Sequence, residues 1–339
     1  MKVWQIPAFG IDRLEMVERA VPELSRGQVL IKVHAVSLNY RDLMVVLGRY
    51  NPKLALPRVP CSDGTGEVIA VGEGVTRVKV GQRVAGIFMQ NWIEGEPNAA
   101  KQRGALGGDI DGMLAEYAVL DEQGVVDVPE HLSYEEAATL PCAAVTAWNA
   151  LVHAAGIKAG DTVVIQGTGG VSIFALQFAK LLGARVLGTS SSDEKLARAA
   201  TLGLDAGVNY KREDWSKWVL EQTGGSGADL IVEVGGAGTL VQSLKCVRVG
   251  GTVAQIGILS QSDDPIQIGP LLHRQIRLRG IYVGSRADFA QMNRAVALHR
   301  LQPQVDQVFG FSEAAKGLTA MESGSHFGKL VIQVNGEKV

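Results

Sequence analysis

The chain has 339 residues, of which 46% are hydrophobic and 20% are charged, and its formal net charge is −2. This length is sufficient for two domains with separate cores, and the balanced charge argues against a nucleic-acid or anionic-membrane partner. No apolar run reaches the roughly 18 residues of a membrane-spanning helix. The N-terminus shows no signal-peptide pattern and the three cysteines are widely spaced, so we expect a cytoplasmic protein without disulfides.

The first 127 residues predict a β-rich, barrel-like domain. Short apolar runs alternate with turns that contain Gly and Pro, and no strand–helix–strand rhythm is present. The predicted strands are Gln28–Val33, Gly66–Val71, Arg83–Gly86 and Leu114–Val119.

Helical signals begin after this region. Ser133 stands three residues before Glu136, which is the pattern of a capping box. A longer helix is expected over about residues 144–155, and it leads into the next strand.

The segment Asp161–Lys180 predicts a strand, a glycine turn and a helix in succession. Its apolar run, Val163–Ile165, is typical of a strand that is buried on both faces. Such a unit binds a dinucleotide when the turn backbone approaches a pyrophosphate at the helix N-terminus. The usual motif for this turn is G-x-G-x-x-G, and Ser172 occupies its third glycine position. An ordinary strand-to-helix turn is the alternative. The turn residues predicted to bind the cofactor are Gly167, Thr168, Gly169, Gly170 and Val171.

Strands and helices continue to alternate after this turn, which indicates a doubly wound parallel sheet, that is, a Rossmann domain. The predicted strands are Ala184–Thr189, Ala206–Asn209, Asp229–Val234 and Gly251–Ile256. A helix over Arg286–His299 and a strand over Lys329–Val334 then return to a different pattern. We therefore expect a Rossmann domain over residues 128–284, and a second domain built from residues 1–127 and 285–339.

The chain resembles the medium-chain dehydrogenase/reductase superfamily over nearly its whole length. The motifs that carry the resemblance, besides the glycine turn, are 27-GQVLIKV, 37-SLNYRD, 63-DGTGEV, 81-GQRV, 141-PCAAVTAW and 324-GSHFGKLV. The resemblance implies a GroES-like first domain, completed by the C-terminal segment, with the substrate bound between the two domains beside the nicotinamide.

The catalytic zinc of alcohol dehydrogenases in this family is held by Cys, His and Cys at positions that match Asn39, Ser62 and Cys142. Neutral oxygen donors are poor substitutes for thiolate and imidazole. The lobe that carries the structural zinc cysteines in relatives, here about residues 91–105, contains none. We therefore expect no metal, and interpret Cys142 as a buried free thiol.

These departures point to the zinc-free branch, which resembles quinone oxidoreductases and enoyl reductases. Tyr50 matches a tyrosine that donates a proton in enoyl-thioester reductases, although it could instead only line the cleft. Tyr40 and Arg41 are expected to face the cleft or the cofactor, and Asp42 to form an ion pair with Arg41. The apolar cluster of Phe88, Met89 and Trp92 could form either a pocket wall or core.

NADPH is the predicted coenzyme. An NAD site carries an acidic residue after the second Rossmann strand, and the matching position here is Ser190. Hydroxyls such as that of Ser190, with the nearby Lys195 ammonium, accept a 2′-phosphate. Asp193 and Glu194 could reach the ribose if the loop is shifted, and residues 190–192 could be only a helix cap. The further residues predicted to contact the cofactor are Asn39, Thr146, Ser191, Lys195, Tyr210, Gly235, Gly257, Ile258 and Tyr282.

Three functions remain open at this point. The first is an NADPH-dependent, zinc-independent reductase of a small enone, quinone or other activated double bond. The second is a zinc-free alcohol or aldehyde dehydrogenase, and the third is a protein that binds NADPH without significant turnover. The resemblance also implies a homodimer, since relatives commonly join their Rossmann sheets edge to edge, and residues 280–283 are expected to form such an edge strand.

Overall fold

The computed structural model describes residues 1–262, 266 and 268–335. The chain divides into two compact units. Unit 1 comprises Met1–Val145 and Val283–Val339, and unit 2 comprises Thr146–Tyr282. No helix in the described ranges has the length and hydropathy needed to cross a membrane.

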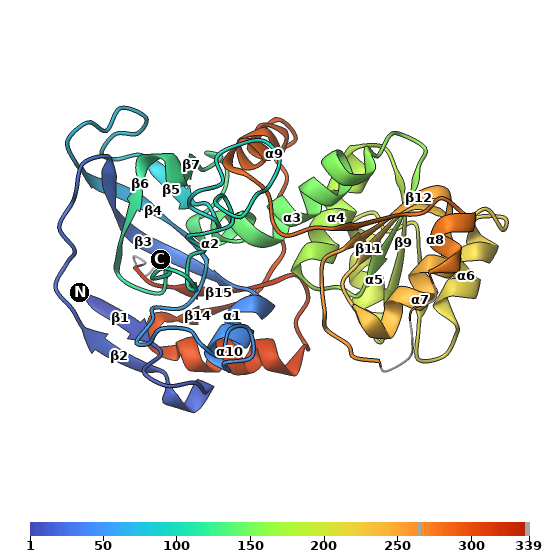
Figure 1. Cartoon of the computed structure of the whole chain (residues 1–339), viewed down its shortest axis with the longest axis horizontal. Coiled ribbons are helices and arrows are strands. Elements are labelled where there is room, and N and C mark those ends of the chain that lie inside the picture. Colours follow the sequence, from blue (N-terminus) through green and yellow to red (C-terminus); the bar gives the residue numbers. More distant parts are fainter. Residues whose placement is uncertain (263–265, 267, 336–339) are drawn as a thin grey trace. The chain divides into compact units, whose positions relative to one another are not determined.

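Unit 1 is built on a seven-stranded sheet, confirming the β-rich prediction (Figure 1). Its order is β14-β15-β3-β4-β5-β7, with β6 also paired to β3, and a separate hairpin joins β1 to β2. The strands are β1 (Lys2–Gln5), β2 (Glu15–Glu18), β3 (Gln28–Leu38), β4 (Asp63–Val71), β5 (Arg83–Gly86), β6 (Tyr117–Asp121), β7 (Val125–Asp127), β14 (Val305–Gly310) and β15 (Lys329–Gln333). The C-terminal strand thus lies inside this sheet, antiparallel to β3.

Short helices surround this sheet. They are α1 (Tyr40–Val46), α2 (Tyr134–Ala138), α9 (Arg286–Leu298) and α10 (Ala314–Ser323), with single 3₁₀ turns at Ile11–Arg13, Glu122–Gly124 and Phe311–Glu313. The predicted capping box at α2 is confirmed, because the Ser133 hydroxyl accepts a hydrogen bond from the Glu136 amide, and the Glu136 carboxylate accepts one from the Ser133 amide. Helix α2 packs on β3 and β4, so residues 128–145 belong to unit 1 and not, as predicted, to the Rossmann unit.

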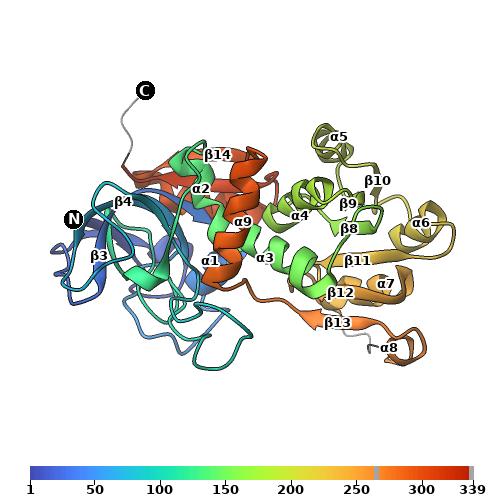
Figure 2. The ribbon, with the colours of Figure 1, turned by 90° about the horizontal axis from the view of Figure 1, so that it is seen from above.

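Unit 2 is a six-stranded parallel sheet of order β10-β9-β8-β11-β12-β13 (Figure 2). Its strands are β8 (Thr162–Gln166), β9 (Arg185–Ser190), β10 (Ala206–Asn209), β11 (Ala228–Glu233), β12 (Val247–Gln255) and β13 (Arg277–Gly280). Its helices are α4 (Gly170–Leu181), α5 (Asp193–Thr201), α6 (Trp215–Gln222), α7 (Ala237–Cys246) and α8 (Gly269–His273). The strand order reverses between β8 and β11, which is the switch point where open α/β sheets bind ligands. The Rossmann prediction is confirmed.

One core cluster joins Val164, Ile231 and Val253 of the sheet to Val219 of α6 and Leu244 of α7. The Trp148 and Phe178 rings meet edge to face at 5.4 Å, and join α4 to the helical segment that precedes β8. This segment runs from Leu140 to Ala155 through two wide π turns, Leu140–Ala144 and Asn149–Ala155, on either side of α3 (Val145–Trp148).

The predicted edge strand at residues 280–283 is misplaced along the sequence. The edge strand of unit 2 is β13, which ends at Gly280 and pairs with β12. Tyr282 lies beyond the strand, and Val283 has a positive φ of 53°, which is incompatible with strand geometry.

Candidate functional site

The glycine turn after β8 has the features of a dinucleotide-binding turn. Gly167 has a φ of 68°, and a Cβ atom added to Gly167 or to Gly169 would meet no other atom within 4 Å. Gly169 is the N-cap of α4 and no side chain caps it, so the first amides of this helix remain available to an anion. Ser172, at the third glycine position, is buried, and its hydroxyl donates to the Gln166 carbonyl at 2.6 Å.

Apart from Thr146 on α3 and Lys195 on α5, the predicted cofactor contacts of unit 2 lie at one edge of the sheet. Because all six strands are parallel, residues that directly follow them meet at the carboxyl edge. The residues at this edge are Gly167–Val171 after β8, Ser190 and Ser191 at the end of β9, Tyr210 after β10, Gly235 after β11, Gly257 and Ile258 after β12, and Tyr282 after β13.

The serine loop after β9 divides into a cap and two other hydroxyl residues. Ser192 is the N-cap of α5, and its hydroxyl accepts from the Lys195 amide, so the cap interpretation is confirmed for this serine alone. Ser190 is 3% exposed and its hydroxyl accepts from the Ser192 amide.

The Asp193 carboxylate, at the start of α5, is bonded to residues at the end of β10 and after it. The Asp193 carboxylate accepts from the Asn209 side-chain amide at 2.8 Å and pairs with Arg212 at 2.8 Å. The bond from Asn209 holds the pKa of Asp193 below its usual value. The Asp193 carboxylate is therefore held toward β10.

Unit 1 contains a buried polar network around Asn39. The Lys329 ammonium, on β15, donates to the Asn39 side-chain oxygen at 2.6 Å and to the Leu38 carbonyl at 2.5 Å. The Asn39 side-chain amide donates to the Ser62 hydroxyl at 3.4 Å, and this hydroxyl donates to Asp63 at 2.7 Å. Sequence reasoning missed Lys329, whose signal was a cation at the start of an otherwise apolar strand.

Burial governs the ionisation of this network. Loss of hydration raises the pKa of Asp63 to about 6, although the nearby Lys329 ammonium opposes the shift. Loss of hydration also raises the pKa of Asp42. The predicted ion pair of Asp42 with Arg41 is confirmed at 3.5 Å, but the carboxylate mainly accepts from the backbone amides of Asn39 and Ser62.

Tyr50 and Tyr40 are accessible, with 44% and 40% of their surface exposed. Arg41 is largely enclosed, since its guanidinium lies 5.2 Å from the centre of the Tyr50 ring and 4.8 Å from that of Phe88. It also donates to the Leu106 carbonyl at 2.6 Å. The Arg41 guanidinium therefore packs against the Tyr50 ring.

The apolar cluster that sequence analysis left open is core. The side chains of Phe88, Met89 and Trp92 are at most 5% exposed, and they pack with Ala105 and Val283. The Trp92 ring nitrogen donates to the Gly95 carbonyl, which fixes this otherwise irregular loop.

Comparison with known proteins decides the family. Residues 25–130 match the alcohol dehydrogenase GroES-like domain family, and residues 170–297 match the zinc-binding dehydrogenase family. A zinc-type alcohol dehydrogenase-like protein of Schizosaccharomyces pombe is 43% identical over 96% of both chains. The chain belongs to the medium-chain dehydrogenase/reductase superfamily.

Solved structures of this superfamily superpose on nearly the whole chain. A Sinorhizobium meliloti protein assigned to the alcohol dehydrogenases has a TM-score of 0.92 at 43% identity, over 98% of both chains. An NAD-dependent alcohol dehydrogenase has a TM-score of 0.91 at 35% identity, over 99% of this chain and 100% of the other.

Reductases of conjugated double bonds are also similar to this chain. An acryloyl-coenzyme A reductase of Metallosphaera sedula is 29% identical over 94% of this chain and 96% of the other. A 2-octenoyl-CoA carboxylase reductase, solved with NADP and 2-octenoyl-CoA, has a TM-score of 0.88 at 26% identity, over 97% of this chain and 84% of the other.

The residues that match zinc ligands in this medium-chain dehydrogenase/reductase do not fit zinc. The Asn39 oxygen is occupied by an ammonium, which would repel a divalent cation, and the Ser62 hydroxyl is a donor to Asp63. Loss of hydration raises the pKa of the Cys142 thiol, which disfavours the thiolate that zinc binds. In the described part of the chain, no three His, Cys, Asp or Glu side chains are grouped as metal ligands.

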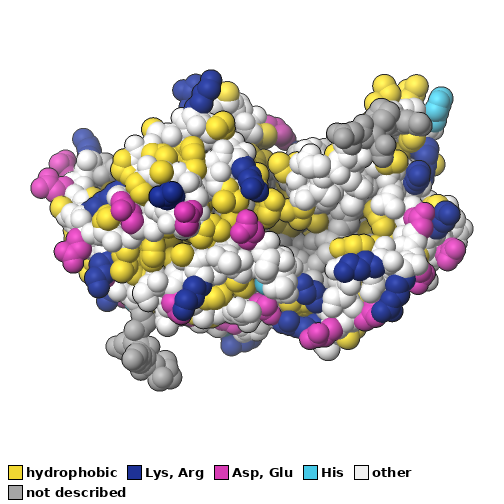
Figure 3. Space-filling model, turned by 90° about the horizontal axis from the view of Figure 1, so that it is seen from below, with side chains coloured by type: hydrophobic (Ala, Val, Ile, Leu, Met, Phe, Trp, Pro, Cys, Tyr) yellow, Lys and Arg dark blue, Asp and Glu magenta, His cyan; other side chains and the backbone are white. Residues whose placement is uncertain are grey.

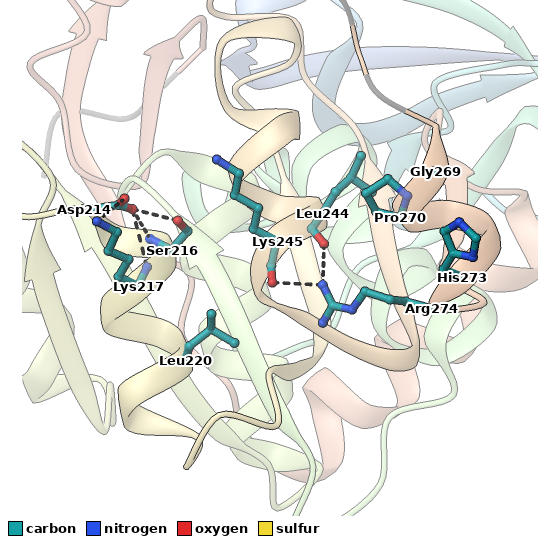
Figure 4. A pocket seen from close by; sticks show the side chains of 10 residues that line it. All are labelled: Asp214, Ser216, Lys217, Leu220, Leu244, Lys245, Gly269, Pro270, His273 and Arg274. Atoms are coloured by element: carbon teal, nitrogen blue, oxygen red, sulfur yellow. Dashed lines mark hydrogen bonds and ion pairs between the residues drawn. The ribbon is translucent and has the colours of Figure 1, made fainter.

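Unit 2 contains a pocket of about 590 Å³ (Figure 4). It is lined by residues of α6, of the end of α7 and of α8, and by none of the predicted site residues. The Arg274 guanidinium donates to the Leu244 and Lys245 carbonyls, so it stabilises the end of α7. On the face of the molecule in Figure 3, acidic and basic side chains are interspersed over both units.

Proposed function

We propose that this chain is an NADPH-dependent, zinc-independent reductase of a small enone, quinone or other activated double bond. The observation that carries the proposal is the Lys329 ammonium bonded to Asn39, where zinc-dependent relatives hold their metal. Alcohol oxidation needs an alkoxide-like transition state, which the metal stabilises. Reduction of a conjugated double bond spreads negative charge over an enolate or phenolate, for which hydrogen-bond donors suffice.

The chemistry divides between coenzyme and protein. Bound NADPH supplies a hydride, which is two electrons with one hydrogen, to one carbon of the double bond and is released as NADP⁺. In this proposal the Asn39 side-chain amide donates a hydrogen bond to the substrate oxygen, whose negative charge grows as the hydride arrives. The Tyr50 hydroxyl would then donate the balancing proton, to the other carbon of an enone or to the phenolate oxygen of a reduced quinone. It would regain the proton from water, to which the exposure of Tyr50 gives access.

The chain's own residues support NADPH as the coenzyme. Ser190 adds no charge at the ribose position, and the Asp193 carboxylate is paired with Arg212. Tyr210, Lys211 and Arg212 are exposed after β10 and can receive a 2′-phosphate. The similar octenoyl-CoA reductase was solved with NADP, whereas a similar alcohol dehydrogenase is described as NAD-dependent.

A zinc-free alcohol or aldehyde dehydrogenase is the second candidate, favoured by the similarity to alcohol dehydrogenases. One assay separates the candidates. NADPH and NADH oxidation is followed with a simple enone and a simple quinone, and NADP⁺ and NAD⁺ reduction with primary and secondary alcohols, each with and without a chelator. NADPH-preferring, chelator-insensitive reduction of the enone or quinone supports the proposal. Alcohol turnover that is lost on chelation and restored by zinc would overturn both zinc-free candidates, and coenzyme binding without any turnover would support a non-catalytic role.

We also propose that the protein is a homodimer joined through β13. All four residues of this edge strand are exposed, and an unprotected edge is prone to pair with another strand. Light scattering should give twice the 36.0 kDa chain mass. Leu278→Pro, which removes a backbone donor from the edge, should shift the measured mass toward that of a single chain. A monomeric mass for the unaltered chain would contradict the proposal.

A further inference from the structure

A carboxylate with no ionic partner is buried at the end of β11. Glu233 is 0% exposed, and no Lys or Arg among the described residues pairs with it. Its two oxygens accept five hydrogen bonds, all from neutral donors. The donors are the Gly235 amide at 2.8 Å, the Gly236 amide at 2.9 Å, the Thr239 hydroxyl at 2.5 Å, the Gln166 side-chain amide at 2.7 Å and the Ser243 hydroxyl.

Such a group is costly unless it is fully hydrogen-bonded, and apolar packing would stabilise the fold as well or better. Packing alone therefore gives no reason for a carboxylate here. The donors indicate another role, because the Gly235 and Gly236 amides come from the turn after β11, which begins α7. The carboxylate holds this turn in one conformation.

Gln166 connects that turn to the glycine turn after β8. Its side-chain oxygen accepts from the Val234 and Gly235 amides, each at 3.2 Å, while its side-chain amide donates to Glu233. Gln166 directly precedes Gly167 in the chain, and its backbone carbonyl accepts from Ser172 of α4. The two glycine turns are thus joined through one amide–carboxylate pair.

The loop after β12 is joined to the same hydrogen-bond network of Glu233 and Gln166, which we call the hub. The Glu233 backbone carbonyl accepts from the Ile256 amide at 2.8 Å and from the Gly257 amide at 3.2 Å. The Gly235 carbonyl accepts from both the amide and the hydroxyl of Ser260. A Cβ atom at Gly257 would lie 2.0 Å from the Val234 carbonyl oxygen, so the loops are too close for any larger residue.

We infer that Glu233 and Gln166 are positioning residues that fix the relative places of the three loops at the carboxyl edge of the sheet, and so set the affinity for the dinucleotide. Glu233 also occupies the Gly235 and Gly236 amides, which directly precede α7. The inference rests on the dinucleotide binding of the proposed function, and is independent of the substrate.

Coenzyme affinity tests the inference. Glu233→Gln turns a carboxylate oxygen into an amide that faces other donors, and should weaken NADPH binding at least tenfold, measured by fluorescence titration. Glu233→Ala should weaken it similarly, and formate, a small carboxylate, should restore it while chloride does not. The matched control is Val219→Ala, which destabilises the same core but touches none of the loops. Normal NADPH affinity in both Glu233 variants would overturn the inference. An equal loss of NADPH affinity in Val219→Ala, at the same unfolding free energy as the Glu233 variants, would also overturn it.

Hydrogen exchange separates this test from the proposed function. In the coenzyme-free protein, Glu233→Gln should speed amide exchange over residues 234–239 and leave α6 unchanged, whether or not any substrate is known. Unchanged exchange there would overturn the hub itself. Failure of the unaltered protein to bind either NADPH or NADH would overturn the dinucleotide premise, and failure to reduce any enone or quinone would overturn only the proposed substrate class.

Discussion

The Lys329 ammonium lies 2.6 Å from the side-chain oxygen of Asn39, a residue 290 positions earlier in the chain. A lysine that is 3% exposed is rare unless it is paired, and here its counter-charges are the buried carboxylates of Asp42 and Asp63. The bond fixes which way the Asn39 amide points, with its oxygen toward the lysine and its nitrogen toward Ser62. It also places a fixed positive charge beside the residue proposed to contact the substrate oxygen.

Lys329→Met keeps much of the side-chain length and removes the charge. We expect kcat to fall by about tenfold or more, because the Asn39 amide loses both its orientation and its polarising partner. The free energy of unfolding should fall by roughly 3 kcal/mol at neutral pH, since buried carboxylates lose their counter-ion. Steady-state kinetics and urea unfolding measure the two effects.

The control for that variant is Lys316→Met, whose side chain is 73% exposed and pairs with Glu313 at the surface. It should change stability by about 1 kcal/mol at most. Equal effects of the two substitutions would show that the buried ammonium has no special role.

Tyr50→Phe removes the proposed proton donor and keeps the ring that stacks against Arg41. A general acid contributes at least about 10²-fold, so kcat should fall by roughly that factor while NADPH affinity stays unchanged. Tyr117→Phe, at the start of β6, serves as the control. A Tyr50 variant with full kcat would assign the tyrosine to lining the site only.

Ser190→Asp places a carboxylate at the ribose position after β9. It should repel the 2′-phosphate and shift the ratio of kcat/KM for NADPH over NADH toward NADH by roughly tenfold or more, equivalent to about 1.4 kcal/mol. Ser226→Asp adds the same charge in the turn before β11, at the opposite edge of the sheet, and should leave the ratio unchanged. A protein that already prefers NADH would refute the coenzyme assignment.

Asp63 predicts a specific pH dependence of stability. Its pKa is about 6 when folded and 3.8 as the ordinary value, so the folded state binds more protons between these pH values. The tighter binding of this proton by the folded state therefore stabilises the fold below about pH 4, and this stabilisation is lost as the pH rises through 6. Relative to Asp63→Asn, the wild-type free energy of unfolding should drop by about 3 kcal/mol from pH 4 to pH 7. Parallel pH profiles for the two proteins would contradict the raised pKa.

Sequence patterns were sufficient for the elements with strong hydrophobic signals. The β-branched run of β8 and the apolar core of β11 predicted their strands to within a residue or two, and β5 and β10 match the prediction at both ends. The edge strand β13 was placed three residues too late, because Leu278 is its only large apolar residue, whereas Ile281 and Val283 follow directly after it.

The candidate site was predictable only where a local motif carries it. The glycine turn and Ser190 follow from their positions relative to strands. Lys329 and Glu233 did not, because each is a charged residue in an apolar strand, and only tertiary structure shows which partners satisfy it. The surroundings of Arg41 also could not be predicted from the sequence, because only the structure shows that the Tyr50 and Phe88 rings enclose its guanidinium.

The position of β15 inside the first sheet has a consequence for biosynthesis. Unit 2 is complete once residue 282 has left the ribosome, and can fold from contacts within one continuous segment. Unit 1 must wait, because β3 lacks its neighbour β15 until residues 329–333 have been translated. The nascent chain thus carries an open strand edge at β3 throughout synthesis of the Rossmann unit, and the Lys329–Asn39 bond is among the last native contacts to form.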